Sequence, residues 1–179
     1  MLGALHIEMV MLSCIGDLLE DSGWTIALSN SGVTSSGNDS LLTGHDVANT
    51  KYAHQVTVMA LHNLMKAAYQ NSPLKNEKNF EDWRIHMETK SPQFKFWSIA
   101  MKMVMGYLMF LLSIRSSNFK LYVSSIGNFL PWIFAFDHVH YARWLTIHHY
   151  DMEMLQEINP EIYEEFKSHR NFTVKRTKN

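Results

Sequence analysis

One stretch of the sequence, Leu130 to Tyr150, holds more titratable and aromatic side chains than any other. It reads LPWIFAFDHVHYARWLTIHHY and contains four of the ten histidines, two of the five tryptophans and two of the seven tyrosines. Imidazole and carboxylate groups are the side chains that bind metal ions or move protons in many proteins. A reactive centre in this chain is therefore expected first in this stretch.

A helix over this region would bring five of its residues onto one side. Their spacings of four, three, four and three are those of a helix face: Asp137, Tyr141, Trp144, His148 and Asp151. One hypothesis is a metal-dependent hydrolase centred on Asp137, His148 and Asp151. The other is a buried polar network whose hydrogen bonds satisfy its polar groups. Its members would be Asp137, Tyr141, Arg143, Trp144 and His148. We favour the network, because a metal shared by His148 and Asp151 needs at least a third ligand and nothing in the sequence fixes one.

The number of histidines overstates the signal for a metal. His138 and His140 lie two residues apart and so diverge on a helix. The adjacent histidines at the end of the stretch also point in two directions. Arg143 is expected to form an ion pair with Asp137 inside the fold. We predict no metal site and no bound cofactor here.

The sequence lacks the signatures of common enzymes. It has no Gly-x-Ser-x-Gly, no His-Glu-x-x-His and no Walker or Rossmann pattern. The single cysteine, Cys14, lies in an apolar run without a basic neighbour, which favours a core residue over a nucleophile. One cysteine excludes an intrachain disulfide and fits a reducing compartment. We expect an intracellular chain, nuclear or cytoplasmic, that is not an enzyme by itself.

Composition places the chain among globular proteins. It has 179 residues, of which 46% are hydrophobic and 18% charged, with a net charge of -1. This balance gives no general attraction to nucleic acid or to an anionic membrane. The last ten positions are nevertheless basic, which predicts a solvated tail or, as the alternative, an arm that contacts nucleic-acid phosphates. The residues concerned are Arg170, Lys175, Arg176 and Lys178.

The elements that would position these residues are mostly helices. We predict a mainly α fold, an irregular bundle of about six helices with one short N-terminal strand over Leu2 to Glu8. The chain is read as a single domain, 1–179. Its parts are a possible remnant of a core strand and helix (1–28), a flexible Ser- and Gly-rich loop (29–45), a helical region (46–168) and a basic tail (169–179).

Three longer helices form the predicted scaffold. The first runs from Asp46, its N-cap, to Gln70, and its predicted apolar stripe consists of Tyr52, Val56, Met59, Leu64 and Tyr69. His54 and His62 share a face of it, and we favour a structural role for both over metal binding. The second helix starts at Ser91-Pro92 and ends near Arg115. The third begins near Pro131, after a turn at Gly127-Asn128, and is predicted to continue toward Asn159-Pro160.

Residues 96–114 are the one segment of the sequence that is long and apolar enough to span a membrane. Lys102 interrupts it, and its flanks show no strong asymmetry of positive charge. A buried core helix is therefore the favoured interpretation. The partners that we expect are nucleic acid or the remainder of a larger protein, and no membrane.

Several segments resemble one protein family in the same order along the chain. The most specific are HIEM, SGWT, YAHQVT and FDHVHYARWL, and SPQFKFW, INPEIYEEF and NFTVKRT agree with them. The family is a group of uncharacterised invertebrate proteins that look like products of mobile elements and are similar to DDE-type transposases with an RNase H-like core. His140, Thr146 and His149-Tyr150 depart from its pattern.

The resemblance implies a transposable-element-derived fragment without catalysis of its own. An RNase H-like nuclease gathers carboxylates around two divalent metal ions, so a metal is expected only if that activity is present. Glu8, at the end of the predicted strand, would then be the candidate core acid. A helical protein-interaction module is the alternative that the residues themselves leave open.

Overall fold

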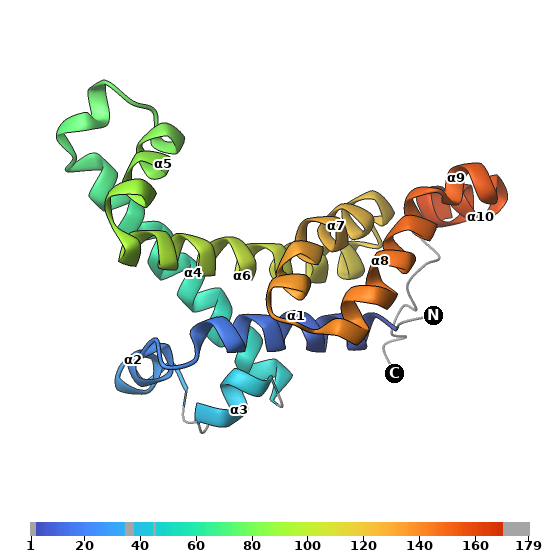
Figure 1. The fold of residues 1–179 in the computed structure, drawn as a ribbon, viewed down its shortest axis with the longest axis horizontal. Coiled ribbons are helices and arrows are strands. Elements are labelled where there is room, and N and C mark those ends of the chain that lie inside the picture. Colours follow the sequence, from blue (N-terminus) through green and yellow to red (C-terminus); the bar gives the residue numbers. More distant parts are fainter. Residues whose placement is uncertain (1–2, 35–37, 45, 170–179) are drawn as a thin grey trace. The chain divides into compact units, whose positions relative to one another are not determined.

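The protein is all-α. A computed structural model describes residues 3–34, 38–44 and 46–169, and these contain no β-strand (Figure 1). The sequence prediction of a mainly α fold is confirmed, but the number of helices is larger than predicted, because several are short. The described elements are α1 (Ala4–Leu19), α2 (Trp24–Asn30), α3 (Asn38–Thr43), α4 (Val47–Gln70), the 3-10 turn η1 (Pro73–Asn76), α5 (Phe80–Lys90), α6 (Pro92–Ser116), α7 (Phe119–Ala135), α8 (Val139–Glu153), α9 (Leu155–Ile158), α10 (Pro160–Glu164) and the π-helical turn η2 (Glu165–His169).

The chain divides into two compact units. Unit 1 combines the chain up to Asp17 with the residues from Gly106 onward, and unit 2 comprises Leu18–Met105. The boundaries fall inside α1 and α6. The prediction of a single domain stays a prediction, because a division by contacts does not define independently folding parts.

The predicted N-terminal strand is wrong, because its residues from Ala4 onward belong to α1. Five of the buried residues of this helix recur at the three- and four-residue spacing of a helix face: Ile7, Val10, Met11, Cys14 and Ile15. The β-compatible residues at the start of the chain therefore continue a helical stripe that a short window misses. Burial raises the pKa of the Cys14 thiol to about 12, and the charge of Asp17 adds to this effect.

Helix α4 begins where the sequence predicts, but it buries a different face. The side chain of Asp46 accepts a hydrogen bond from the Asn49 amide at 3.2 Å, which caps the helix. The predicted apolar stripe is largely on the surface, with Tyr52 and Met59 55% and 67% exposed. The buried residues of this helix are instead small or polar, apart from one methionine: Thr50, Ala53, His54, Thr57 and Met65.

Helix α2 packs on this polar face of α4. The Trp24 ring stacks on the His54 imidazole with centroids 4.9 Å apart, and Trp24 Nε1 donates to Thr57 Oγ1 at 2.8 Å. Thr57 Oγ1 in turn donates to the Ala53 carbonyl at 2.8 Å. Burial lowers the pKa of His54 to about 4, so the ring is neutral at pH 7. The predicted structural role of His54 fits this packing.

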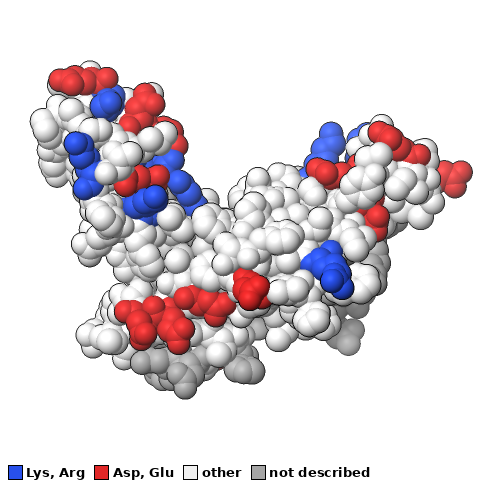
Figure 2. Space-filling model, viewed as in Figure 1, with Lys and Arg blue, Asp and Glu red and all other residues white. Residues whose placement is uncertain are grey.

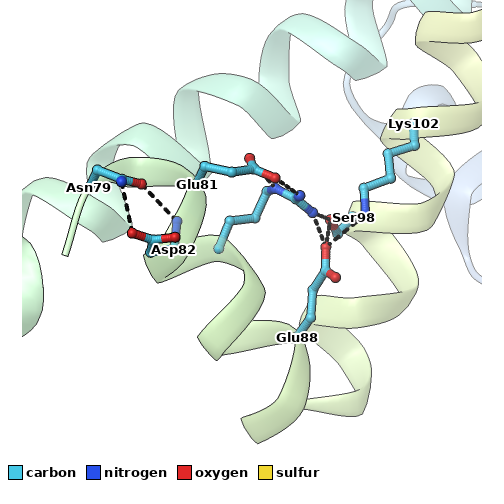
Figure 3. A network of polar contacts seen from close by, with 7 residues as sticks. Asn79, Glu81, Asp82, Glu88, Ser98 and Lys102 are labelled. Atoms are coloured by element: carbon cyan, nitrogen blue, oxygen red, sulfur yellow. Dashed lines mark hydrogen bonds and ion pairs between the residues drawn. The ribbon is translucent and has the colours of Figure 1, made fainter.

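A charged network joins α5 to α6 in unit 2 (Figure 3). The guanidinium of Arg84 is buried, bonds both carboxylate oxygens of Glu81 and contacts Glu88, and it donates to Ser98 Oγ at 3.1 Å. Lys102 Nζ reaches Glu88 Oε1 at 3.2 Å. Burial works to raise the pKa of Glu88, but the hydrogen bonds from Ser98 and Lys102 and the nearby cations outweigh it and lower the pKa.

Among the described residues, α6 alone is long and apolar enough to cross a membrane. This criterion uses only length and composition, and the core helix of a soluble protein also meets it. Five hydrophobic residues of α6 are buried: Ala100, Met103, Val104, Tyr107 and Phe110. The predicted absence of a membrane partner stays a prediction.

Helix α6 ends where the sequence predicts a break. Ser117 has a φ of 49°, and the Asn118 amide donates to the Ser113 carbonyl at 2.9 Å, so that α6 ends in a left-handed turn. Asn118 then caps α7 by accepting from the Leu121 amide at 3.0 Å. In unit 1 the two helices flank a buried aromatic contact between Phe110 and Tyr122.

Candidate protein interface

Helices α7 and α8 make the most extensive helix–helix contact of unit 1 and lie side by side (Figure 1). Helix α8 contributes Ala142 and Leu145 to the buried side. The approach is close at Gly127, where an added Cβ would lie 2.5 Å from His149 Nε2. The predicted turn at Gly127-Asn128 is therefore wrong, because α7 continues through both residues and includes Pro131.

A tight turn separates α7 from α8, so the predicted long helix from Pro131 is two helices. The Asp137 amide donates to the Phe134 carbonyl at 3.2 Å and the His138 amide to the Ile133 carbonyl at 3.1 Å. This pair of bonds is a Schellman motif, in which Asp137 takes the left-handed position with a φ of 57°. Glycine is the usual residue there, and aspartate tolerates the conformation.

One face of α8 is exposed although much of it is apolar. Val139, Trp144, Ile147 and Tyr150 are 57, 59, 47 and 58% exposed. Arg143 is exposed between them, and helical spacing places these five residues on the side of α8 opposite Ala142 and Leu145. We refer to the five as the α8 face. In Figure 2 charged residues gather on α5, around α9 and α10 and, as an acidic row, over α1 and α2, whereas most of the surface over α7 and α8 in that view is uncharged apart from one basic patch.

A small hollow adjoins the start of the α8 face. Its volume is about 240 Å³. It lies where α7 turns into α8, and the residues that line it are Ile133, Phe134, Asp137, His138, Val139, Ala142 and Arg143. Phe134, 59% exposed, extends the apolar surface across this corner. A side chain from a partner could enter here.

The predicted buried polar network is wrong in most of its members. Asp137, Arg143 and Trp144 are exposed, and no ion pair joins the first two. The reason is the turn, which places Asp137 outside α8 and breaks the expected stripe. Tyr141 is half-buried, and only His148 has a polar partner on another helix.

His148 is held by α7. Its Nε2 and Tyr122 Oη lie 2.8 Å apart in a hydrogen bond. Burial lowers the pKa of His148, while the charge of Asp151 works in the opposite direction. Burial also raises the pKa of Tyr122 to about 12. A neutral phenol and a neutral imidazole therefore join α7 to α8 at pH 7.

The other candidate acids do not assemble a reactive centre. Glu8 lies on α1 and accepts a hydrogen bond from the buried Tyr107 Oη at 3.0 Å. His138 Nε2 pairs with Asp17 Oδ2 at 3.0 Å. Among the residues that the structure describes, no three His, Cys, Asp or Glu side chains gather in the geometry of a metal site. The hydrolase hypothesis thus finds no site around Asp137, His148 and Asp151.

A larger open groove of about 650 Å³ lies along the other edge of α8. Both polar and apolar side chains line it, and His149 Nε2 and Glu153 Oε1 on its wall are 3.6 Å apart. The remaining lining includes Lys120, Asn128 and Tyr163. The predicted nucleic-acid contacts in the basic tail, Arg170, Lys175, Arg176 and Lys178, lie outside the described residues.

The sequence prediction missed the α8 face because it assigned Trp144 to the core. A signal was present, since Val139, Arg143, Ile147 and Tyr150 follow one another at spacings of four, four and three. That stripe contains an arginine and excludes Ala142 and Leu145. When one side of a helix carries aromatic residues and the other carries aliphatic ones, the pattern alone does not show which side is buried.

Residues 64–179 match a protein family described as Domain of unknown function (DUF8702). The matched part includes all of α5 to α10, and with them the α8 face. No curated protein and no solved structure matches the chain. Because the match extends over more than half of the sequence, the chain belongs to the DUF8702 family.

Proposed function

We propose that this chain is a non-catalytic helical protein-interaction module, derived from a mobile element, and that the α8 face binds its protein partner. The observation that carries the proposal is the exposure of Trp144, Ile147 and Tyr150 together on one side of one helix. Single exposed apolar residues are common on soluble proteins, whereas a contiguous group marks an interaction surface.

The composition of the α8 face is that of an interface centre. Tryptophan, tyrosine and arginine are enriched among the residues whose truncation weakens protein complexes by about 2 kcal/mol or more. Trp144, Arg143 and Tyr150 supply all three within eight positions. Burying apolar surface contributes roughly 25 cal/mol per Å², so covering these rings is favourable for any partner of matching shape.

The geometry favours binding over hydrolysis. The candidate ligand Asp137 lies in the turn before α8, and His148 is engaged by Tyr122. The hollow beside Asp137 is small and mostly apolar in its lining residues. A binding surface needs none of the convergent acids and bases that a hydrolase requires.

The mobile-element origin rests on the sequence resemblance. The strings SPQFKFW, FDHVHYARWL and INPEIYEEF, which carry it, lie inside the part of the chain that matches the family. A relation to RNase H-like transposases follows from the same strings. Nucleic acid then remains a proposed second partner, through the basic residues at Arg170, Lys175, Arg176 and Lys178.

Photo-crosslinking from the α8 face tests the function. A benzophenone amino acid is placed at position 147, and a matched variant carries it at position 26, which is also an exposed isoleucine but lies in unit 2. We expect a discrete protein adduct from position 147 in an extract of the source cells and none from position 26. Equal labelling from both positions, or no adduct from 147, would refute the proposal.

A further inference from the structure

Four residues of the α8 face, together with the neighbouring exposed Asp151, have a symmetric order in the sequence. Ile147 lies at its centre, and Arg143 and Asp151 lie four residues before and after it. Trp144 and Tyr150 lie three residues before and after. All five side chains are exposed, so the face presents a basic, an aromatic, an aliphatic, an aromatic and an acidic group in that order.

This order is complementary to its own reverse. We propose that the α8 face binds the α8 face of a second copy of this chain, with the two helices antiparallel and Ile147 against the partner's Ile147. The inference rests on the proposed function, whose binding surface it uses, and names the partner.

Helix geometry places the opposite charges at the same level. Four residues correspond to about 6 Å along a helix, so an antiparallel pair centred on Ile147 brings Arg143 level with the partner's Asp151. By symmetry Asp151 is level with the partner's Arg143, and each contact occurs twice, as in any two-fold interface. Trp144 then lies level with the partner's Tyr150, at either side of the aliphatic centre.

The charges select the antiparallel arrangement over the parallel one. A parallel pair in register would place Arg143 against the partner's Arg143 and Asp151 against the partner's Asp151, and like charges repel at such a contact. Reversing one helix converts two repulsions into two attractions while the apolar centre stays the same. Charge therefore sets the orientation, and the aromatic residues supply most of the affinity.

The expected association is weak. One helix pair with a few neighbouring side chains buries less than the roughly 1,600 Å² of a standard stable interface. We therefore expect a dimer that dissociates in the micromolar range. Exposed ion pairs are screened by salt, so the association is also expected to weaken between about 0.05 and 0.5 M salt.

Charge reversal followed by sedimentation velocity tests the pairing on the purified full chain. Arg143→Asp alone and Asp151→Arg alone each place like charges together and should weaken dimerisation by at least about tenfold. The double variant Arg143→Asp/Asp151→Arg restores opposite charges and should return to within about threefold of the unaltered chain. Lys66→Asp on α4, also exposed, is the matched control and should not alter the equilibrium.

Three results would overturn the pairing: a monomer throughout the micromolar range, a dimer unaffected by the single reversals, or a double variant no better than the singles. Far-ultraviolet circular dichroism of each variant verifies that it is folded. A monomeric chain that still gives a single heterologous adduct from position 147 would refute only the self-pairing. A monomeric chain without any adduct would refute the proposed function as well.

Discussion

Helices α4 and α8 both depart from the rule that apolar side chains are buried and polar ones exposed, but they depart from it in different ways. Helix α4 buries Thr50, His54 and Thr57, whose polar groups face the interior of unit 2. Helix α8 exposes Trp144 and Tyr150 and buries Ala142 and Leu145. Helix α4 buries polar side chains, of which Thr57 bonds Trp24 inside the fold, and helix α8 exposes large apolar side chains.

The difference shows how to interpret an aromatic or a histidine in a helical chain. The Trp24 ring stacks on His54 and its Nε1 donates to Thr57 Oγ1, so the burial of these side chains is explained by contacts inside unit 2. Trp144 is 59% exposed, so that part of its ring is not covered by the described residues of unit 1. Covered side chains account for stability, and a contiguous group of uncovered apolar side chains is where binding is expected.

The largest expected effect compares two tryptophans. Trp24→Ala removes a buried ring and should lower the free energy of unfolding by about 3–5 kcal/mol. Trp144→Ala removes an exposed ring and should change it by less than about 0.5 kcal/mol. Urea unfolding followed by circular dichroism measures both. Equal losses would show that Trp144 belongs to the core and would remove the contrast between α4 and α8.

The next effect is the pH dependence that His54 confers. Its folded pKa, about 4, lies below the unfolded value of about 6.5, so the unfolded state binds the proton more tightly. The stabilisation is complete above pH 6.5 and is lost as pH falls toward 4, by roughly 3 kcal/mol at most. Unfolding free energies of the unaltered chain between pH 7 and 4 should therefore decline more steeply than those of His54→Phe.

The exposed His62 on the same helix provides the matched control for that measurement. His62→Phe should keep the steep decline of the unaltered chain. If His54→Phe and the unaltered chain decline in parallel, then His54 is accessible to protons in the folded state, and the buried polar face of α4 is not as we describe it.

Two threonines give a third and smaller comparison. Thr57 and Thr146 each donate to the carbonyl four residues earlier, at 2.8 and 2.6 Å. Only Thr57 also accepts from Trp24 Nε1. Thr57→Val leaves that buried donor unsatisfied and should lower the free energy of unfolding by about 1–3 kcal/mol. Thr146 is exposed, so Thr146→Val should change the free energy of unfolding by less than about 0.5 kcal/mol. Thermal unfolding of both variants would show whether the costs differ.

The smallest expected effect is a gain in stability at the turn before α8. Asp137 holds a φ of 57°, which glycine adopts without strain. Asp137→Gly should raise the free energy of unfolding by about 0.5–1 kcal/mol, and Asp137→Ala should lower it. A loss of stability with glycine, measured by urea unfolding, would mean that the carboxylate itself holds the turn and that the α8 face is positioned differently.

Local chemistry decided which features could be predicted from the sequence. The start of α4 at Asp46, the start of α6 at Ser91-Pro92 and its end at Ser116 depend on caps and turns a few residues long, and all three were predicted. The end of α7 was missed because an aspartate, not a glycine, takes the left-handed position.

The buried faces of α4 and α8 depend on contacts that are distant in sequence. On α4, Tyr52 and Met59 predict one buried side, but Ala53 and Thr57 allow closer packing on the other. On α8, Trp144 is hydrophobic enough for a core and yet exposed. Pattern alone therefore did not show that Arg143 and Trp144 lie on the surface and not in a buried network.

The most direct test of the α8 face as an interface is the yield of crosslinked adduct from position 147 with and without Trp144→Ala. The thermal unfolding midpoints of the two proteins are measured first. We predict that Trp144→Ala unfolds at the same temperature and loses most of the adduct. An undiminished adduct in that variant, or no adduct in either protein, would contradict it.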